Sequence, residues 1–202
     1  ISENNNLAAT FKDEKLTIHN IEKKELIFEK HLHKESLDLF IEPKFSNSEN
    51  VFVYLTRSEK YSVNILSLRD GTISRITTDT GISDLHISQN DQVYVAYSNG
   101  NSSSLITKPL ETGEYEITSI NNTRRLLSLK SKNNHIHALS RSEEGALIYN
   151  EIINDHLVRI VPLNKEGRVI NYETTPNNQS VILHTAEGEL SIFSLTLNEA
   201  QG

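Results

Sequence analysis

The segment Asn50-Val51-Phe52-Val53-Tyr54-Leu55 begins with a turn-forming residue and continues as an unbroken apolar run. Residues 61–68 then alternate between polar and apolar side chains, which is the period of a β-strand with one covered face. Asp70-Gly71 is a strong signal for a tight hairpin turn, and residues 72–76 form another short strand-like run. Together with the mostly apolar residues 37–41, these segments predict four consecutive antiparallel strands.

This four-strand unit recurs along the chain. Its apolar run is anchored at the following positions: Leu7, Val51, Val93, Ile136 and Val181. The anchors are spaced by 44, 42, 43 and 45 residues, close to the ~40–45 residues of a four-stranded propeller blade. The period divides the chain into five repeats of a single domain, at residues 1–34, 35–79, 80–121, 122–164 and 165–202.

The predicted fold is therefore an all-β propeller of about five blades with three to four antiparallel strands each. Helical periodicity is nearly absent, and the one helix-like segment, residues 123–132, occupies a strand position in its repeat. Radial repetition leaves only short sheet edges, whereas a flat sheet of this size would curl or aggregate. Because the first and last repeats each lack one strand, either the ring is incomplete within this chain or it closes with three-stranded end blades. We expect an incomplete ring with further blades outside this chain.

Composition limits the classes of function. The 202 residues carry a net charge of −7, which argues against direct nucleic-acid contact because that contact needs a basic face. No apolar run approaches the ~18–20 residues of a membrane helix, so we expect no membrane insertion by this chain. The absence of cysteine excludes a thiol nucleophile and a thiolate metal site. Since the chain contains no methionine and begins at Ile1, we expect it to be a piece of a longer protein.

The segment Pro43-Lys44-Phe45-Ser46-Asn47-Ser48-Glu49-Asn50-Val51-Phe52-Val53-Tyr54 resembles the signature of TolB-like, WD-repeat-like propeller repeats. That signature reads roughly proline, any residue, an aromatic, serine, proline, aspartate, glycine and then an apolar strand. The first proline, the aromatic residue, the serine and the strand match, whereas Asn47-Ser48-Glu49 replace the later proline, aspartate and glycine. Residues 68–77 are similar to the segment that closes each blade in the same repeats.

This resemblance implies a setting in the bacterial periplasm or at the cell exterior. Such propellers occur as docking proteins, as sensor domains of membrane-bound winged-helix transcription regulators of the CadC or ToxR kind, and as gates in front of peptidase domains. We therefore expect a periplasmic or extracellular domain, tethered through a membrane segment outside these residues. Nothing in composition or spacing selects among the three settings.

Few residues have a spacing that suits chemistry. His135-Ile136-His137 places two imidazoles on one strand face, ~6–7 Å apart, a spacing that can chelate a metal. No carboxylate completes that site, so we predict no metal and keep His135 and His137 as weak candidates. Arg124-Arg125 is a candidate for anion binding, although a solvated surface pair is the simpler interpretation. The sequence has no nucleophile elbow and no phosphate-binding glycine loop, so we predict no catalytic residue and no cofactor.

We predict a non-catalytic domain that binds another protein or senses a small extracytoplasmic ligand. Binding is expected on one rim of the disc, in loops that join successive blades and precede equivalent strands. The candidate binding residues are Ser46, Asn47, Asn50, Gln89, Asn90, Asp91, Lys132, Asn133, Asn177 and Asn178. The alternative is a hydrolase, or a propeller that gates one, acting on glycans or peptides. That alternative requires a polar cluster at the central channel with an acid or base of perturbed pKa.

The unbroken apolar runs also predict which side chains are buried. A strand that is covered on both faces has no reason to alternate, so the second strand of each blade should lie between two neighbouring blades. Val53, Val95, Ala138 and Leu183 hold equivalent places in these runs. We expect all four to be almost wholly buried.

Overall fold

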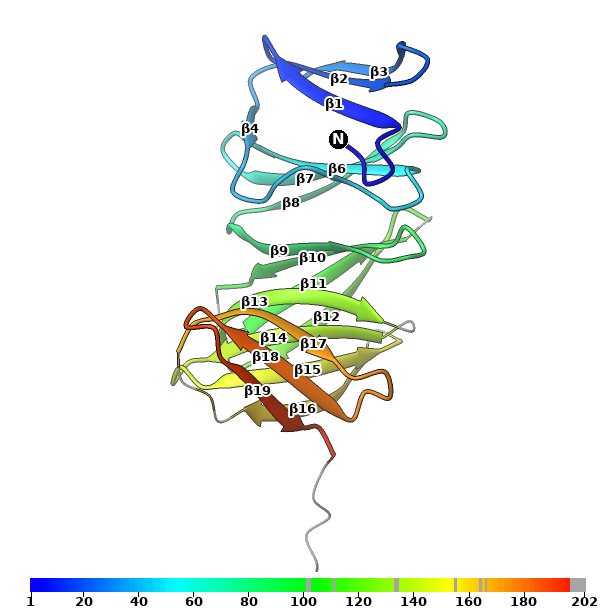
Figure 1. The fold of residues 1–202 in the computed structure, drawn as a ribbon. Coiled ribbons are helices and arrows are strands. Elements are labelled where there is room, and N and C mark those ends of the chain that lie inside the picture. Colours follow the sequence, from blue (N-terminus) through cyan, green and yellow to red (C-terminus); the bar gives the residue numbers. More distant parts are fainter. Residues whose placement is uncertain are drawn as a thin grey trace, which may run out of the picture.

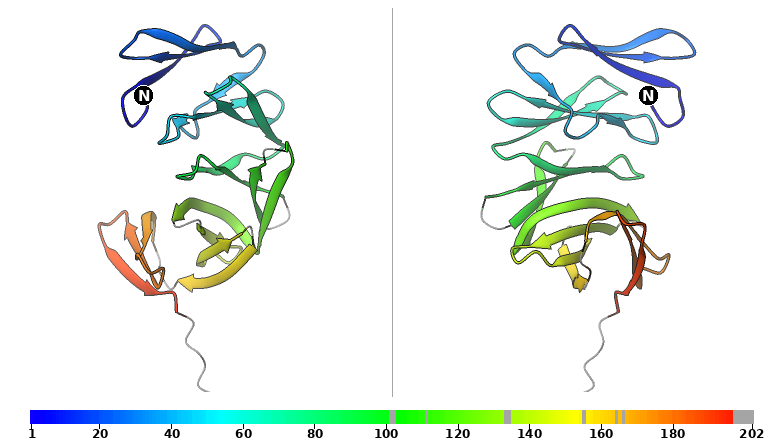
Figure 2. Two further views of the ribbon diagram at one scale, coloured as in Figure 1. Left: turned by 90° about the vertical axis from the view of Figure 1, so that its right-hand side faces the viewer. Right: turned by 60° about the vertical axis from the view of Figure 1, so that its left-hand side comes forward.

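The chain folds into five antiparallel β-sheets that follow one another in sequence order (Figure 1). The computed structural model describes residues 1–100, 103–110, 112–132, 135–154, 156–163, 165 and 167–196. We call the sheets blades I to V. Figure 2 shows them fanned out as an open arc, with blades I and V at its two ends.

Each blade is built from consecutive strands. Blade I holds β1 (Leu7–Lys12), β2 (Lys15–Asn20) and β3 (Glu25–His31), and blade II holds β4 (Ser36–Asp38), β5 (Lys44–Phe45), β6 (Val51–Arg57), β7 (Tyr61–Ser67) and β8 (Ile73–Thr78). Blade III holds β9 (Ile82–Ile87), β10 (Val93–Ser98), β11 (Ser103–Pro109) and β12 (Tyr115–Asn121). Blade IV holds β13 (Thr123–Lys132), β14 (His135–Ser142), β15 (Leu147–Ile153) and β16 (His156–Leu163), and blade V holds β17 (Val169–Thr174), β18 (Ser180–Thr185) and β19 (Leu190–Ser194). Every strand pairs antiparallel with its neighbour in the same blade.

The predicted fold class is confirmed. The described part of the chain contains no helix, and its sheets have three, four or five strands. None of its segments is a helix long and apolar enough to cross a membrane. Between the described residues of blades I and V there is no hydrogen bond or ring contact, so the arc is open in this structure (Figure 2). The assignment of residues 1–202 to a single domain stays a prediction.

One predicted strand is wrong in part. The sequence predicts a continuous strand over residues 37–41, but β4 ends at Asp38 and the pairing with β6 resumes only at Lys44. The carboxylate of Asp38 accepts a hydrogen bond from the backbone N–H of Phe40 at 2.9 Å, a local bond that competes with the sheet. The chain therefore leaves the sheet, and the side chains of Leu39 and Phe40 are 68% and 73% exposed.

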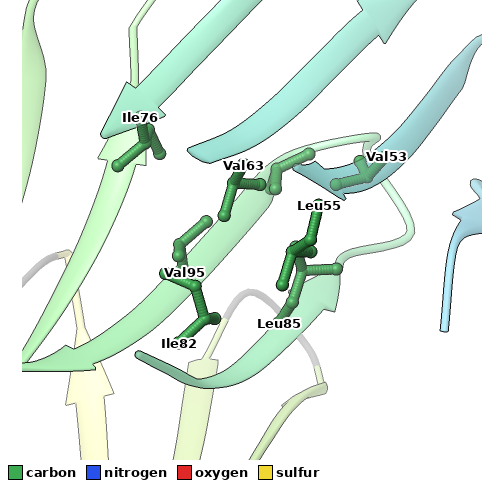
Figure 3. Packing of buried hydrophobic residues seen from close by; sticks show 8 residues of the cluster. Val53, Leu55, Val63, Ile76, Ile82, Leu85 and Val95 are labelled. Atoms are coloured by element: carbon green, nitrogen blue, oxygen red, sulfur yellow. The ribbon is translucent and has the colours of Figure 1, made fainter. Parts of the chain in front are cut away.

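The hydrophobic cores lie between blades. Figure 3 shows Val53, Leu55, Val63 and Ile76 of blade II packed against Ile82, Leu85 and Val95 of blade III. Further clusters fill the interfaces between blades I and II, III and IV, and IV and V. Val53 is 1% exposed, and Val95, Ala138 and Leu183 are 0% exposed, which confirms the burial expected of the second strands. In β6, β10 and β14 both faces of the second strand meet a core, which explains their unbroken apolar runs. The expectation of two covered faces is wrong for β18 of the end blade V, where Val181 and Leu183 pack on blade IV but Ile182 and His184 on the other face are not buried.

The loop in front of the second strand in blades II, III and V, and in front of β1 in blade I, has one construction. A hydroxyl accepts a hydrogen bond from a backbone N–H after the turn, in the pairs Ser2 and Leu7, Ser46 and Val51, Ser88 and Gln92, and Thr175 and Ser180. Each turn also contains a residue with positive φ: Asn5, Glu49, Asp91 and Asn178, at 54–62°. Short polar side chains tolerate this left-handed backbone better than apolar ones, which explains the recurrent polar turns.

Candidate functional site

The loops in front of the second strands lie along one edge of the arc, at the right-hand side of Figure 1. We call this edge, formed by residues 2–6, 46–50, 88–92 and 175–179, the first rim. Hydrogen bonds join its neighbouring loops: Asn4 to the Asn47 carbonyl at 3.2 Å, Asn6 to Glu49 at 3.1 Å, Ser48 to Asp91 at 2.5 Å, and Asn50 to Asp91 at 3.0 Å. The first rim is thus a continuous polar surface across blades I to III.

The sequence-predicted binding residues lie on or beside this rim. Ser46, Asn47, Asn50, Gln89, Asn90, Asp91, Asn177 and Asn178 belong to its loops, Lys132 ends β13 next to it, and Asn133 lies outside the described residues. One part of the prediction is wrong: the loops connect the first and second strands of the same blade, not successive blades. The Ser46 side chain is buried and serves the turn itself, since its hydroxyl accepts the N–H of Val51.

A cavity of about 350 Å³ opens on the first rim between blades III and IV. It is lined by Ser88, Gln89, Asn90, Gln92, Tyr94, Lys108, Ser131, Lys132, Ile136 and Asn154. The lining offers amides and hydroxyls, which both donate and accept hydrogen bonds, and two ammonium groups. None of its described lining residues carries a carboxylate or an imidazole. Gln89, Asn90 and Lys132 were among the predicted binding residues, whereas Asn154 comes from a turn between third and fourth strands that the sequence did not single out.

The first strands of neighbouring blades are bonded to each other through partly buried polar groups. The ammonium of Lys44 on β5 donates to the Leu85 carbonyl on β9 at 2.9 Å. The backbone N–H of Leu129 on β13 donates to the Asp84 carboxylate on β9 at 2.6 Å. Burial raises the pKa of Asp84 and lowers the pKa of Lys44, because each site disfavours the charged form. These contacts hold blades II, III and IV at fixed spacing.

The His86 side chain on β9 contacts the Ser131 side chain on β13. In hydrolases a serine hydroxyl can act as the nucleophile and an imidazole as its base. The His86 Nε2 atom lies 2.6 Å from the Ser131 hydroxyl oxygen. Burial lowers the pKa of His86 to about 4, and the charges of Lys44 and Lys130 add to that effect. In the described part of the chain no carboxylate or carbonyl binds the other ring nitrogen. The imidazole is therefore a weak base without the third group that orients the base in a catalytic triad.

The two histidines of β14 have different partners. His135 Nδ1 lies 2.9 Å from a carboxylate oxygen of Glu151, while His137 Nδ1 bonds the hydroxyl of Tyr149. The two imidazole rings are 6.3 Å apart and tilted to each other. The described residues include no group of three histidine or carboxylate side chains arranged to hold a metal ion. The structure thus uses each ring for a separate hydrogen bond.

An ion pair within blade IV, between Glu151 on β15 and Arg159 on β16, is bonded to blade V through its arginine. The Glu151 side chain is 2% exposed, and its carboxylate accepts a 2.6 Å bond from Arg159 Nε. Arg159 Nη1 also donates to the carbonyls of Asn178 and Leu195, at 3.2 and 3.0 Å. Sequence reasoning missed this pair, although a lone glutamate in the apolar run of β15 was a signal for a buried partner.

Arg125 lies on the opposite edge of the arc from the first rim. It lines a cavity of about 370 Å³ together with Arg57, Phe40 and Tyr61. The guanidinium carbon of Arg57 is 4.8 Å from the centre of the Tyr61 ring, a cation–π contact. Arg124, the other half of the predicted anion candidate, does not line this cavity.

Comparison with known proteins places the chain among β-propellers by structure alone. No family model and no curated protein matches the sequence. A structure of the dihydro-heme d1 dehydrogenase NirN in complex with DHE has a TM-score of 0.62 at 13% identity, over 96% of this chain and 43% of that chain. The Cps50 (Swd1) β-propeller domain of Myceliophteria thermophila has a TM-score of 0.56 at 11% identity, over 100% of this chain and 66% of that chain.

The chain therefore spans less than two thirds of each of these two structures. At such low identity the likeness shows the fold and nothing finer. The shared fold presents loops from several blades side by side.

Proposed function

We propose that the chain is a non-catalytic binding domain that engages a protein partner on the first rim, at the cavity between blades III and IV. The observation that carries this proposal is the chemistry of the cavity. Its amides, hydroxyls and ammonium groups can hydrogen-bond to peptide groups, and its described lining residues include no carboxylate or imidazole to act as acid or base.

The surface around the cavity supports a partner larger than a small molecule. The cavity draws residues from two blades, and the bonded row of loops extends the polar surface to blade I. An extended peptide or a protruding loop could contact several of these turns at once. The interblade hydrogen bonds hold the loops in place before binding, which lowers the entropy cost of association.

Selection of random peptides on the purified chain tests this proposal. The selected peptides should bind a Gln89→Ala, Asn154→Ala double variant at least about tenfold more weakly than the unchanged chain, because the substitutions remove two side-chain amides from the cavity lining. Glu59→Ala changes an exposed turn between second and third strands, at the opposite edge, and serves as the control. Selected peptides that bind the double variant as well as the unchanged chain would place the binding surface elsewhere.

The second candidate function is hydrolysis, and the contact between His86 and Ser131 favours it. Ser131 lines the cavity on the first rim, so a bound ester or amide would lie near its hydroxyl. The low pKa of His86 and the missing third group argue for little or no turnover. Turnover of chromogenic esters, glycosides and peptides that disappears in Ser131→Ala would establish the enzyme and displace the binding-domain proposal.

We further propose that the domain works in the periplasm or outside the cell, as the sensor part of a membrane-tethered regulator. The lack of cysteine and the resemblance to TolB-like repeats support this setting. Fusion of alkaline phosphatase behind this domain in the parent protein tests it, since the phosphatase is active only after export. An inactive fusion would place the domain in the cytoplasm.

A further inference from the structure

A second cavity, of about 230 Å³, lies between blades IV and V near their first strands. Its lining consists of Lys130, Ser131, Lys132, His137, Tyr172, Glu173 and Thr174. It is separate from the cavity of the proposed function, although Ser131 and Lys132 line both. Two ammonium groups and one buried imidazole make its lining rich in hydrogen-bond donors.

The two lysines donate hydrogen bonds only to neutral acceptors. Lys130 Nζ donates to the Asn171 side-chain oxygen at 2.7 Å and to the Tyr172 carbonyl, and it lies 4.9 Å from the Tyr172 ring centre. Lys132 Nζ donates to the Thr174 carbonyl at 2.8 Å. Within the described residues neither ammonium forms an ion pair with a carboxylate. Glu173 lines the cavity as well, but it is exposed and pairs with neither lysine.

His137 contributes a buried donor without an acceptor. The residue is 1% exposed, and its Nε2 atom has no hydrogen-bond partner. Burial keeps the imidazole neutral by lowering its pKa to about 4, and it also raises the pKa of the Tyr149 hydroxyl. When the Tyr149 hydroxyl donates to Nδ1, only the Nε2–H stays unpaired. The opposite arrangement would leave both the phenol hydrogen and the Nε2 lone pair unpaired, so the first is favoured.

We propose that this cavity binds a compact oxyanion, the carboxylate or phosphate group of a small ligand. One oxyanion would give Lys130 and Lys132 a hydrogen-bonded counter-charge, whereas Glu173 attracts Lys130 only through space. An oxygen atom of the same group would accept the otherwise unpaired Nε2–H of His137. Charge-assisted hydrogen bonds of this kind are the strong ones, and they form here next to a low-dielectric interface.

Titration of the purified chain with sodium phosphate and, separately, sodium acetate tests the proposal at pH 7 and constant ionic strength. The readout is the nitrogen resonance of His137 Nε2, assigned by its loss in His137→Gln. We expect a saturable shift with at least one of the two anions, which also tells phosphate from carboxylate. Lys132→Gln should weaken binding about tenfold or more, whereas Lys132→Arg should retain it.

The control is Lys23→Gln, which removes an exposed lysine of blade I. Equal weakening by Lys23→Gln and Lys132→Gln would show general ionic attraction and overturn the site. Absence of a saturable shift with both anions would also overturn it. Neither result bears on the peptide-binding rim, because the rim is tested by variants of Gln89 and Asn154.

Discussion

The hydroxyl of Ser48 donates a 2.5 Å hydrogen bond to the carboxylate of Asp91, and the two residues are 43 positions apart, one repeat of the sequence. The other carboxylate oxygen of Asp91 accepts a 3.0 Å bond from the Asn50 amide. Both contacts join a turn of blade II to the matching turn of blade III. The repeat is therefore visible as a bond between equivalent loops, and the first rim is held together by such bonds.

We expect Asp91→Ala to lower the free energy of unfolding by about 1–2 kcal/mol. The substitution removes both interblade bonds and places alanine at a φ of 62°, where a residue with a Cβ is strained. Asp91→Asn should cost less than about 1 kcal/mol, since asparagine tolerates this backbone. Urea denaturation of both variants measures the difference. A loss below about 0.5 kcal/mol in Asp91→Ala would show that the bond contributes nothing.

We expect Leu183→Ala to cost about 2–5 kcal/mol, because it opens a cavity between blades IV and V. Val53→Asp should unfold the chain, since it buries a charge that has no partner. The control, Glu143→Ala, changes an exposed turn and should stay within about 0.5 kcal/mol. Denaturation in urea measures all three variants. Tolerance of Val53→Asp together with unfolding by Glu143→Ala would contradict the assigned strand faces.

The sequence pattern predicted those features of the fold that depend on residues close together in the chain. The period, the burial of second strands such as Val51–Arg57 and the polar turns at Ser46 and Ser88 follow from side chains that act on their own strand or turn. The break after Asp38 was not predicted, because its cause is one side-chain bond that competes with an apolar run.

Contacts across a blade interface were not predictable from one sequence. His86 meets Ser131 from 45 residues away, and the register of two blades decides which side chains face each other. The same holds for Lys130 and Asn171, which are 41 residues apart. The period predicts only that equivalent positions are near. Whether two residues whose separation differs from the repeat length by a few positions come into contact depends on how far each blade is twisted relative to the next.

Stability should fall as the pH drops from about 6.5 toward 4. Burial lowers the pKa of both His86 and His137 from the ordinary 6.5 to about 4, so between these values the unfolded chain binds protons that the folded chain does not. Each histidine contributes at most about 1.4 kcal/mol per pH unit in this window. The raised pKa of Asp84 acts in the opposite direction at the acid end.

Urea denaturation at pH 7, 6 and 5 measures this slope. His137→Gln should make it shallower, whereas His184→Gln, which replaces an exposed histidine, should keep it. A slope that is the same in His137→Gln and the unchanged chain would mean that the folded state protonates His137 readily.

Arg159 should control how firmly blade V is attached. Its guanidinium reaches from β16 to the carbonyls of Asn178 and Leu195, so it spans both ends of the β18–β19 hairpin. Arg159→Gln removes these bonds and leaves Glu151 buried with only His135 as partner. We expect amide hydrogen exchange of residues 169–194 to speed up about tenfold, with residues 7–31 of blade I unchanged.

Glu151→Gln separates the attachment of blade V from the burial of charge. It removes the carboxylate but leaves Arg159 its two carbonyl bonds to blade V. Global stability should drop by about 1–3 kcal/mol, because the guanidinium loses its charged partner. Exchange in residues 169–194 should then rise no more than in the other blades, since the contacts that fix blade V persist. If Glu151→Gln releases blade V as strongly as Arg159→Gln does, the ion pair and not the two carbonyl bonds attaches that blade.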